Sequence, residues 1–442
     1  MSDNPMVLKD GDTVCVVGGG PGGSACAVAL KKEAKSVGKN IHVVVIEPKK
    51  FNEHRHYNQC IGVLSPPLET ILDENLGICF TQDLVLKEMK QYCIHSDRLH
   101  MNLHGEEDGK TYAVSRIKFD ALMLEEARKS GAEIRYNRVT GMEVNDDGVL
   151  VYSDGDNCKA QVVVGAFGMD EGTAQLFEQA TPYRQPDCLN TIITHIYPGQ
   201  EFLDQVGPSI QAFLLSMKGV EFGAVTPKID HLSINIAGRR VSSKVMLEFL
   251  RSDPVQRFLP PHKRREKPLK YFKGKFPIAP ATGFFGDRYV TIGDAAGLMR
   301  PFKGKGINSA CLTGIYVARS IVHHGFSGQA FENHFYKDCE DLTGDLPYGR
   351  VIRLLTNLCT RLKFMDHLLV IAAMDSVFRS CMFNCVSGQK SYKTIFRETA
   401  SLGLGFSFLR EIFKRFILNH PARFPSSIKE ADIIPASVER PL

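Results

Sequence analysis

A glycine-rich turn near the N-terminus constrains the fold of this chain more than any other feature. In the segment TVCVVGGGPGGSACAVALKKEAK, Gly18, Gly20 and Gly23 form the pattern GxGxxG directly after an apolar stretch, and helical spacing follows. A second apolar stretch, IHVVVIE, ends at Glu47. The sequence therefore predicts a βαβ unit at the start of an α/β fold.

The same pattern indicates a dinucleotide site. Glycines permit the tight turn and let backbone N–H groups approach a pyrophosphate, whose negative charge is favoured at a helix N-terminus. The carboxylate of Glu47, at the end of the second strand, can hold ribose hydroxyls. A glycine-rich turn used only for packing is the alternative, and the full strand-turn-helix-strand context favours the dinucleotide.

A distant glycine-rich junction favours FAD over NAD. In VTIGDAAGLMRPFKGKGINSACLTG another apolar strand runs into a helix, where Asp294 can bind ribitol or phosphate and residues 304–308 can lie beside a flavin ring. Each residue taken singly could instead cap or end a helix. Because both junctions agree, we expect FAD, held without a covalent bond.

The remaining pattern predicts how the chain is organised. A hairpin turns at Asp154-Gly155, and the strand after it returns to the sheet. We expect an FAD-binding domain over 1–184 with a loop excursion near 60–110, an antiparallel sheet substrate domain over 185–275, a second part of the FAD-binding domain over 276–330, and a helical C-terminal region over 331–442.

Composition narrows the class of function. With 442 residues, 43% hydrophobic and 23% charged, the chain has the composition of a globular protein. A net charge of +5 without interleaved aromatics argues against nucleic acid. The 12 cysteines show no zinc spacing, so no metal is predicted. Without a signal-peptide pattern or a long apolar run, we expect a cytoplasmic protein with reduced thiols.

Four motifs, in this order, resemble the flavoproteins of the geranylgeranyl reductase family. They are the N-terminal fingerprint, RIKFDALMLEEARKSGAE, VVGAFG and IGDAAGLMRPFKGKGINSA, and they cover roughly residues 10–325. This family shares its fold with aromatic-hydroxylase-type flavin monooxygenases. The resemblance implies a Rossmann-like FAD-binding domain built from discontinuous segments. Together the motifs and the resemblance predict these cofactor contacts: Gly18, Gly20, Gly23, Glu47, Arg116, Gly293, Asp294, Gly304, Gly306, Ile307 and Asn308.

A cysteine-glycine loop follows the fingerprint. Reductases of this family commonly carry C-x-G-x-L-S, which CIGVLS matches from Cys60 to Ser65. A disulfide reductase needs a second cysteine about five residues on, where this chain has serine, so a redox dithiol is not predicted. We expect Cys60 to be catalytic, by delivering a proton or gating the flavin. The alternatives are a small packing side chain at Cys60 and proton donation by His54 or His56.

Two departures from the family pattern bear on the substrate and the reaction. The substrate-domain motif, usually aromatic-rich and ending in Phe-Pro, appears only as VEFGAVTPK over 220–228, in a chain without tryptophan. Phe167 stands where the family has aspartate, which argues against a nicotinamide-dependent hydroxylase. Halogenases of this fold carry a tryptophan-rich motif that is absent here.

The leading hypothesis is an FAD enzyme that reduces carbon–carbon double bonds of a long apolar, isoprenoid or lipid substrate. The alternatives are an FAD-dependent monooxygenase and a non-catalytic lipid-binding flavoprotein. Only one dinucleotide fingerprint is present, so an electron donor, which could be NADPH, ferredoxin or a quinol, must dock at the surface or use the flavin face.

The C-terminal region suggests peripheral contact with the inner face of a membrane. In GFSFLREIFKRFIL, apolar residues recur on one helical face beside basic ones, as in an interfacial helix or a core-packing helix. The apolar set is Phe406, Leu409, Phe413, Phe416 and Ile417. The basic run over 261–268, PHKRREKP, can add attraction to anionic lipid or form a solvated loop.

Overall fold

The glycine-rich turn lies within a parallel sheet, as the sequence predicts. The computed structural model describes residues 6–51, 60–103, 110–260, 269–300, 306–399, 407 and 409–412. Strand β1 (Thr13–Val17) leads through the turn into helix α1 (Pro21–Ser36), and β2 (His42–Ile46) returns parallel to β1. The predicted βαβ unit is therefore confirmed.

A six-stranded sheet surrounds this unit, in the order β18-β19-β12-β1-β2-β8. Its further strands are β8 (Glu133–Arg135), β12 (Val162–Gly165), β18 (Phe285–Gly286) and β19 (Tyr289–Thr291). All neighbouring pairs are parallel except β18–β19. Because the inner strands are buried on both faces, their sequences are continuous apolar runs rather than alternating ones.

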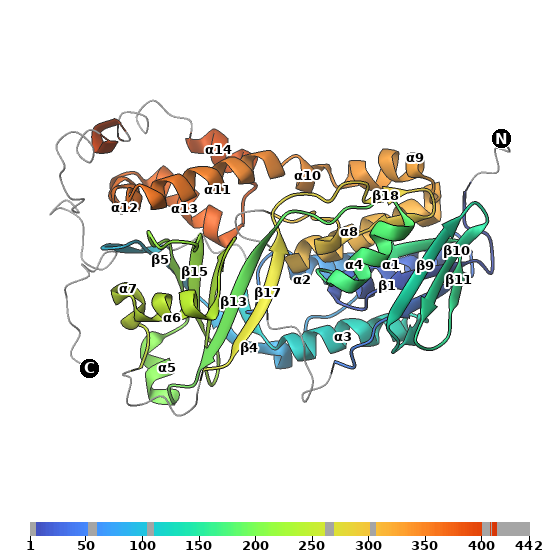
Figure 1. Cartoon of the computed structure of the whole chain (residues 1–442), viewed down its shortest axis with the longest axis horizontal. Coiled ribbons are helices and arrows are strands. Elements are labelled where there is room, and N and C mark those ends of the chain that lie inside the picture. The colour runs from blue at the N-terminus through green and yellow to red at the C-terminus, as the bar shows by residue number, and fades with distance from the viewer. Residues whose placement is uncertain are drawn as a thin grey trace.

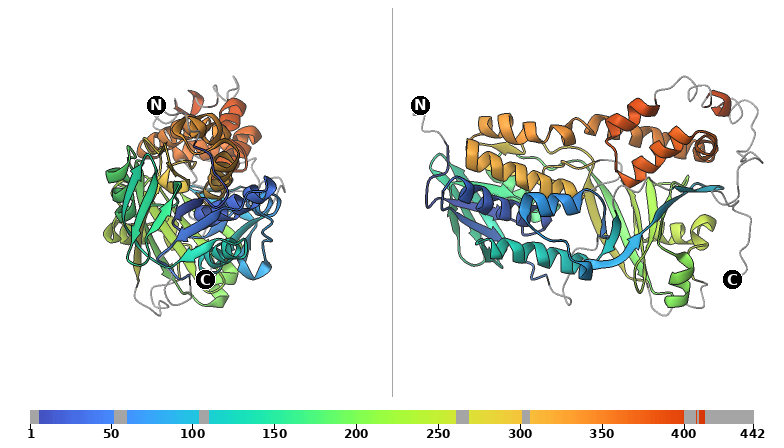
Figure 2. Two further views of the ribbon diagram at one scale, coloured as in Figure 1. Left: turned by 90° about the vertical axis from the view of Figure 1, so that its right-hand side faces the viewer. Right: turned by 180° about the vertical axis from the view of Figure 1, so that it is seen from behind.

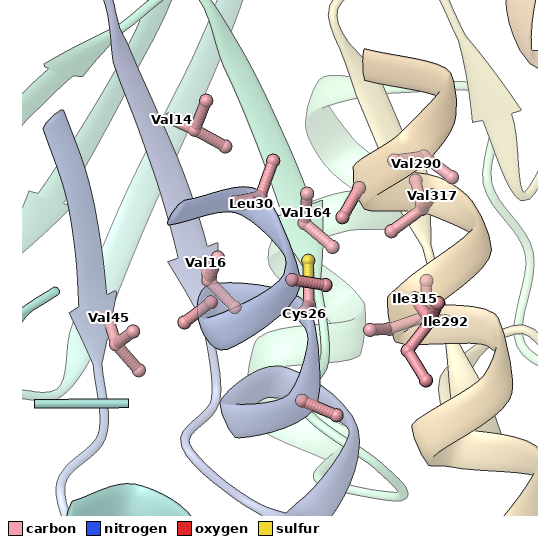
Figure 3. Packing of buried hydrophobic residues seen from close by; sticks show 14 of the residues in the cluster. Val14, Val16, Cys26, Leu30, Val45, Val164, Val290, Ile292, Ile315 and Val317 are labelled. Atoms are coloured by element: carbon pink, nitrogen blue, oxygen red, sulfur yellow. The ribbon is translucent and has the colours of Figure 1, made fainter. Parts of the chain in front are cut away.

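Helices pack closely against this sheet. Helix α8 (Gly306–Arg319) lies against α1, and α3 (Arg116–Lys129) also contacts α1. Glycine allows the close approach of α1 and α8, because a Cβ on Gly314 would lie 2.6 Å from the carbonyl oxygen of Gly22. Figure 3 shows the core between these elements, with side chains from β1, β2, β12, α1 and α8 among them.

The predicted hairpin is confirmed. Strands β9 (Val139–Asn145), β10 (Gly148–Ser153) and β11 (Cys158–Ala160) form an antiparallel sheet, and Asp154-Gly155 lies in the connection between β10 and β11. The strand that returns to the parallel sheet is β12. Helix α4 (Glu171–Ala180) follows and contacts β9.

A seven-stranded sheet lies beside the parallel sheet along the long axis of the molecule (Figures 1 and 2). Its order is β17-β13-β16-β15-β14-β5-β6. Five strands come from the predicted substrate region: β13 (Cys188–Ile196), β14 (Ser209–Phe213), β15 (Phe222–Pro227), β16 (Leu232–Gly238) and β17 (Tyr271–Pro277). Helices α5 (Gln200–Val206), α6 (Ser243–Arg251) and α7 (Asp253–Gln256) share a core with them.

The predicted excursion near 60–110 contains four short strands and three short helical turns. It supplies β5 (Gln91–His95) and β6 (His100–Leu103) to the seven-stranded sheet, where β5 pairs parallel to β14. It also supplies β3 (Val63–Leu64) and β4 (Val85–Met89), which flank β7 (Thr111–Val114) in a small sheet. Between them lie the short helix α2 (Leu68–Thr70), a π-helical turn and a 3-10 turn. Strands this short carry little local signal, which is why sequence analysis assigned a loop.

The C-terminal region is helical where the structure describes it, as predicted. Its elements are α9 (Gly328–Ala330), α10 (Glu340–Thr343), α11 (Leu346–Arg361), α12 (Met365–Met374), α13 (Ser376–Ser387) and α14 (Tyr392–Thr399). Helices α11–α14 gather over the seven-stranded sheet, at the opposite end from β9–β11 (Figure 1). Within the described residues, no helix is both long and apolar enough to cross a membrane.

Candidate functional site

The glycine turn is shaped for close backbone approach. Gly18 has φ +107°, and a Cβ there would collide with the carbonyl oxygen of Ala166. A Cβ on Gly23 would collide with the carbonyl oxygen of Gly18, so the start of α1 packs directly on the turn. Gly20 instead faces open space, and it is the N-cap of α1. The turn therefore presents backbone and a helix N-terminus on its open side, as a pyrophosphate requires.

Glu47 ties the end of β2 to this turn. Its Oε2 accepts a hydrogen bond from the backbone N–H of Gly19 at 2.8 Å, and its Oε1 accepts one from the N–H of Lys49 at 2.9 Å. Burial raises the pKa of the Glu47 carboxyl, while these two N–H donors oppose the rise. The residue predicted to hold ribose thus also organises the backbone of the glycine turn.

Arg116 is buried at the first position of α3. Its Nε and Nη2 donate to the carboxylate of Asp120, one helical turn on, at 2.8 to 3.0 Å. Burial alone would lower the pKa of Arg116, but attraction to Asp120 and to the Cys60 sulfur outweighs it and raises the pKa. Arg116 therefore stands as a cation between Asp120 and Cys60.

Asp294 presents an unsatisfied buried oxygen. It lies in a short 3-10 turn, Gly293–Ala295, and its Oδ1 has no hydrogen-bond partner among the described residues. Burial raises the pKa of Asp294 to about 6, against the opposing attraction of Arg116. A Cβ on Gly306 would lie 3.2 Å from this oxygen, so glycine leaves the space in front of it open. A buried acceptor of this kind requires a donor such as a hydroxyl of a bound group.

Helix α8 is hydrogen-bonded both to the cysteine-glycine loop and to the 3-10 turn that carries Asp294. Asn308 Nδ2 donates to the carbonyl oxygen of Ser65 at 3.1 Å, which ties α8 to the cysteine-glycine loop. The N–H of Gly293 donates to Thr313 Oγ1 at 3.0 Å, and Ile307 packs against the main core. Gly304, also predicted to lie near the flavin, falls outside the described residues, as do His54 and His56.

Cys60 is exposed, which argues against the alternative of a buried packing side chain. Its Sγ accepts a hydrogen bond from the N–H of Gly62 at 3.4 Å. Gly62 has φ +66°, and a Cβ there would lie 2.9 Å from the carbonyl oxygen of Val114 and 3.0 Å from Arg116 Cγ. The loop is thus pressed against β7 and Arg116, which fixes the position of the sulfur.

Sequence analysis missed Lys228. This residue follows β15, and its side chain is only 3% exposed. Its Nζ donates to the carbonyl oxygens of Gly62 at 3.4 Å and Val114 at 3.5 Å. Burial lowers the pKa of Lys228 to about 8, with Cys60 opposing the change and Arg116 adding to it. In the sequence, the residue appears only as a lysine at the end of the apolar segment VEFGAVTPK. The neighbouring residues do not predict that its side chain is buried.

Phe167 has a packing role. Its ring lies 4.8 Å from that of Phe177 and 5.9 Å from that of Tyr183. The departure from aspartate therefore fills an apolar space beside the glycine turn. All twelve cysteines lie in the described part of the chain, and none is in a disulfide. Among the residues that the structure describes, no cluster of His, Cys, Asp and Glu could hold a metal ion.

Comparisons with known proteins confirm the resemblance that the motifs indicate. No protein-family model matches the chain. The chain is 24% identical over 372 residues to a digeranylgeranylglycerophospholipid reductase of Methanococcus vannielii, covering 79% of this chain and 89% of the relative. It is 25% identical over 424 residues to digeranylgeranylglycerophospholipid reductase 1 of Methanothermobacter thermautotrophicus, covering 89% and 98%.

Solved structures share the fold. A geranylgeranyl bacteriochlorophyll reductase-like protein from Thermoplasma acidophilum matches with a TM-score of 0.65 and 18% identity, over 92% of this chain and 97% of that one. A flavin-dependent brominase matches with a TM-score of 0.63 and 18% identity, over 87% and 97%. The same fold thus carries reductases and halogenating enzymes, so the reaction must be argued from the site.

Proposed function

We propose that this protein is an FAD-dependent oxidoreductase that reduces carbon–carbon double bonds of a long apolar, isoprenoid or lipid substrate. The observation that carries the proposal is the arrangement of Cys60, Arg116 and Lys228. A thiol lies near two buried cations, in a loop tied by Ser65 to the start of α8. The names of the archaeal relatives support a reductase of isoprenoid lipids.

The residues present fit FAD. The turn from Gly18 to Gly23 offers backbone and a helix N-terminus to the pyrophosphate. Glu47 stands at the end of β2, where ribose hydroxyls are held in this fold. The free Oδ1 of Asp294 would accept from a hydroxyl of the ribityl chain. When bound and reduced, FAD supplies hydride to one carbon of the double bond.

Cys60 supplies the proton for the other carbon. Breaking the S–H bond and forming the C–H bond leaves a negative charge on the sulfur. That charge faces the Arg116 guanidinium, the Lys228 ammonium and the N–H of Gly62, and each of them stabilises it. Because Cys60 is exposed, water can return the proton before the next turnover.

Lys228 is a positioning residue in this scheme. Its hydrogen bonds to Gly62 and Val114 hold the cysteine-glycine loop against β7, and its charge acts on the sulfur rather than on the substrate. The lowered pKa of about 8 leaves the amine largely protonated at neutral pH. The seven-stranded sheet thereby contributes a side chain to the site that the FAD-binding segments form.

The donor of electrons to the flavin belongs to the same proposal, with NADPH, ferredoxin or a quinol as candidates. An assay can bypass it by reducing the purified flavoprotein with dithionite under anaerobic conditions. Detergent-solubilised digeranylgeranylglycerophospholipid is then mixed in, and flavin re-oxidation is followed by stopped-flow absorbance. We expect re-oxidation together with a product heavier by two hydrogens for each double bond.

Three outcomes would overturn the proposal. Oxygen uptake with a hydroxylated product would make the protein a monooxygenase. A flavin that stays reduced in the presence of alkenes would make it a binding protein, and a protein that purifies colourless and takes up no added FAD would remove the cofactor itself.

A further inference from the structure

Helix α11 exposes an apolar stripe to solvent. Val351, Leu354, Leu355, Leu358 and Leu362 recur at the spacing of one helical face. Their exposed fractions are 41%, 68%, 50%, 50% and 46% in that order. Scattered exposed leucines are common on protein surfaces, but a continuous run over about three turns at the end of one helix is a patch that marks a contact surface. We call these five residues the leucine stripe.

The stripe is not the face that α11 packs inward. On another face, Arg353 donates from Nε and Nη2 to the Glu221 carboxylate, at 2.7 Å for both contacts, and Asn357 Nδ2 donates to Glu221 at 2.8 Å. Gly349 and Thr360 are also buried. Tyr348 and Ile352 pack on the neighbouring helices, so α11 is anchored through other side chains and leaves the leucine stripe outward.

The part of the chain that carries the stripe, from α11 onward, exposes more basic than acidic side chains. The exposed Lys and Arg residues in the described part of 346–412 are Arg350, Arg361, Lys363, Lys390, Lys393, Arg397 and Arg410. The four acidic residues described in this range are buried or half-buried, and each has a partner within the protein. Asp366 accepts from Ser96, Asp375 caps α13, Glu398 pairs with Lys390, and Glu411 pairs with His367.

We propose that the leucine stripe of α11 docks onto an anionic phospholipid bilayer. Leucines that enter the headgroup boundary leave water, and basic residues beside them are attracted to anionic lipid. Charge favours lipid over a second copy, since a two-fold contact through the stripe would bring Arg350 and Arg361 near their own counterparts. It also disfavours cover by residues 413–442, in which Lys and Arg outnumber Asp and Glu.

This surface is distinct from the helix that sequence analysis expected over 406–417, most of which lies outside the described residues. The stripe also goes beyond the proposed reaction, because binding needs neither cofactor nor substrate. A failure of docking would leave alkene reduction in detergent unaffected, and a failure of catalysis would leave docking unaffected.

Vesicle flotation of the full-length protein tests the proposal. We expect the protein to float with phosphatidylcholine vesicles that contain phosphatidylglycerol, and to be released at high salt because screening weakens the attraction. The double variant Leu354→Ser/Leu358→Ser should bind at least tenfold more weakly. The matched control is Leu247→Ser on α6, where the leucine is 36% exposed, and it should bind like wild type.

Thermal unfolding checks that each variant is folded, which we expect because the changed residues are exposed. A second variant, Arg350→Gln/Arg361→Gln, should lose the preference for anionic vesicles. Wild-type protein that stays unbound at low salt overturns the proposal, and so does a stripe variant that floats like wild type. Sedimentation equilibrium supplies the remaining check, because a dimer that the stripe variant abolishes would assign the stripe to self-association.

Discussion

The Lys228 Nζ lies 3.4 Å from the carbonyl oxygen of Gly62, so a side chain from the seven-stranded sheet reaches the loop that carries Cys60. The contact joins residues that are far apart in the sequence. It makes the geometry of the cysteine loop depend on the sheet that the sequence predicts to be the substrate domain.

Replacement of Lys228 by Met should leave FAD bound but slow alkene-dependent re-oxidation, because the sulfur loses a facing cation. The dependence of the re-oxidation rate on pH distinguishes the effect of the Lys228 charge from the effect of its packing. With a pKa of about 8, the wild-type amine loses its charge above that pH, so the wild-type rate should fall there. The Met variant should lack this step. A variant whose profile still falls near pH 8 would show that another group titrates.

Cys60→Ser and Cys60→Ala should both bind FAD and fold normally. Their re-oxidation by alkene should slow by about 10²–10⁴-fold, the usual contribution of a general acid. Reduction of the flavin by dithionite should be unchanged, because the thiol acts only on the alkene half-reaction. Single-mixing stopped-flow on each half-reaction gives the comparison. Wild-type rates in both variants would leave the proton to another donor.

Glu47→Ala should weaken FAD binding by roughly 1.5–3 kcal/mol, about tenfold to a hundredfold, because charge-assisted hydrogen bonds are lost. The apoprotein should also lose stability, since the N–H groups of Gly19 and Lys49 lose their acceptor. Fluorescence titration with FAD and thermal unfolding measure the two effects. The control is Glu133→Ala on the neighbouring β8, where the carboxylate is exposed and both quantities should stay near wild type.

Asp294 should make the apoprotein less stable as the pH rises from about 4 to about 6. Its folded pKa of about 6 lies above the ordinary aspartate value of 3.8, so protonation favours the folded state below 3.8 and this stabilisation is lost as pH rises through 6. The shift corresponds to about 3 kcal/mol. Urea unfolding at several pH values should show that the free energy of unfolding of the wild type falls between about pH 4 and about pH 6, by about the amount given above. The Asp294→Asn variant should lack this fall. An equal fall in the wild type and the variant would mean that another group causes the pH dependence.

The sequence predicts the parts of the site that short patterns encode. Gly18, Gly23 and Glu47 lie where the fingerprint places them, because a turn and its flanking strands are local structures. Asp294 and Gly306 are close together, as the second junction implies. Lys228 could not be found in this way, because its burial results from contact between the seven-stranded sheet and a distant loop.

The same limit applies to β5 and β6. Each strand is only a few residues long. Strand β5 pairs in parallel with β14, and the spacing of apolar residues within such a short segment cannot predict that pairing. Cys60 was identified by its resemblance to a family motif. Arg116 was predicted as a cofactor contact, but its place beside Cys60, like that of Lys228, required the three-dimensional arrangement.

The pairing of β5 with β14 also governs how the chain can be built. During synthesis the β5–β6 hairpin leaves the ribosome long before β14, its parallel neighbour, exists. Until then the inner edge of β5 is an open row of hydrogen-bonding groups, which is the kind of edge that promotes aggregation. The seven-stranded sheet therefore cannot close as one strand follows another, and residues 185–275 on their own would lack the hairpin that completes it.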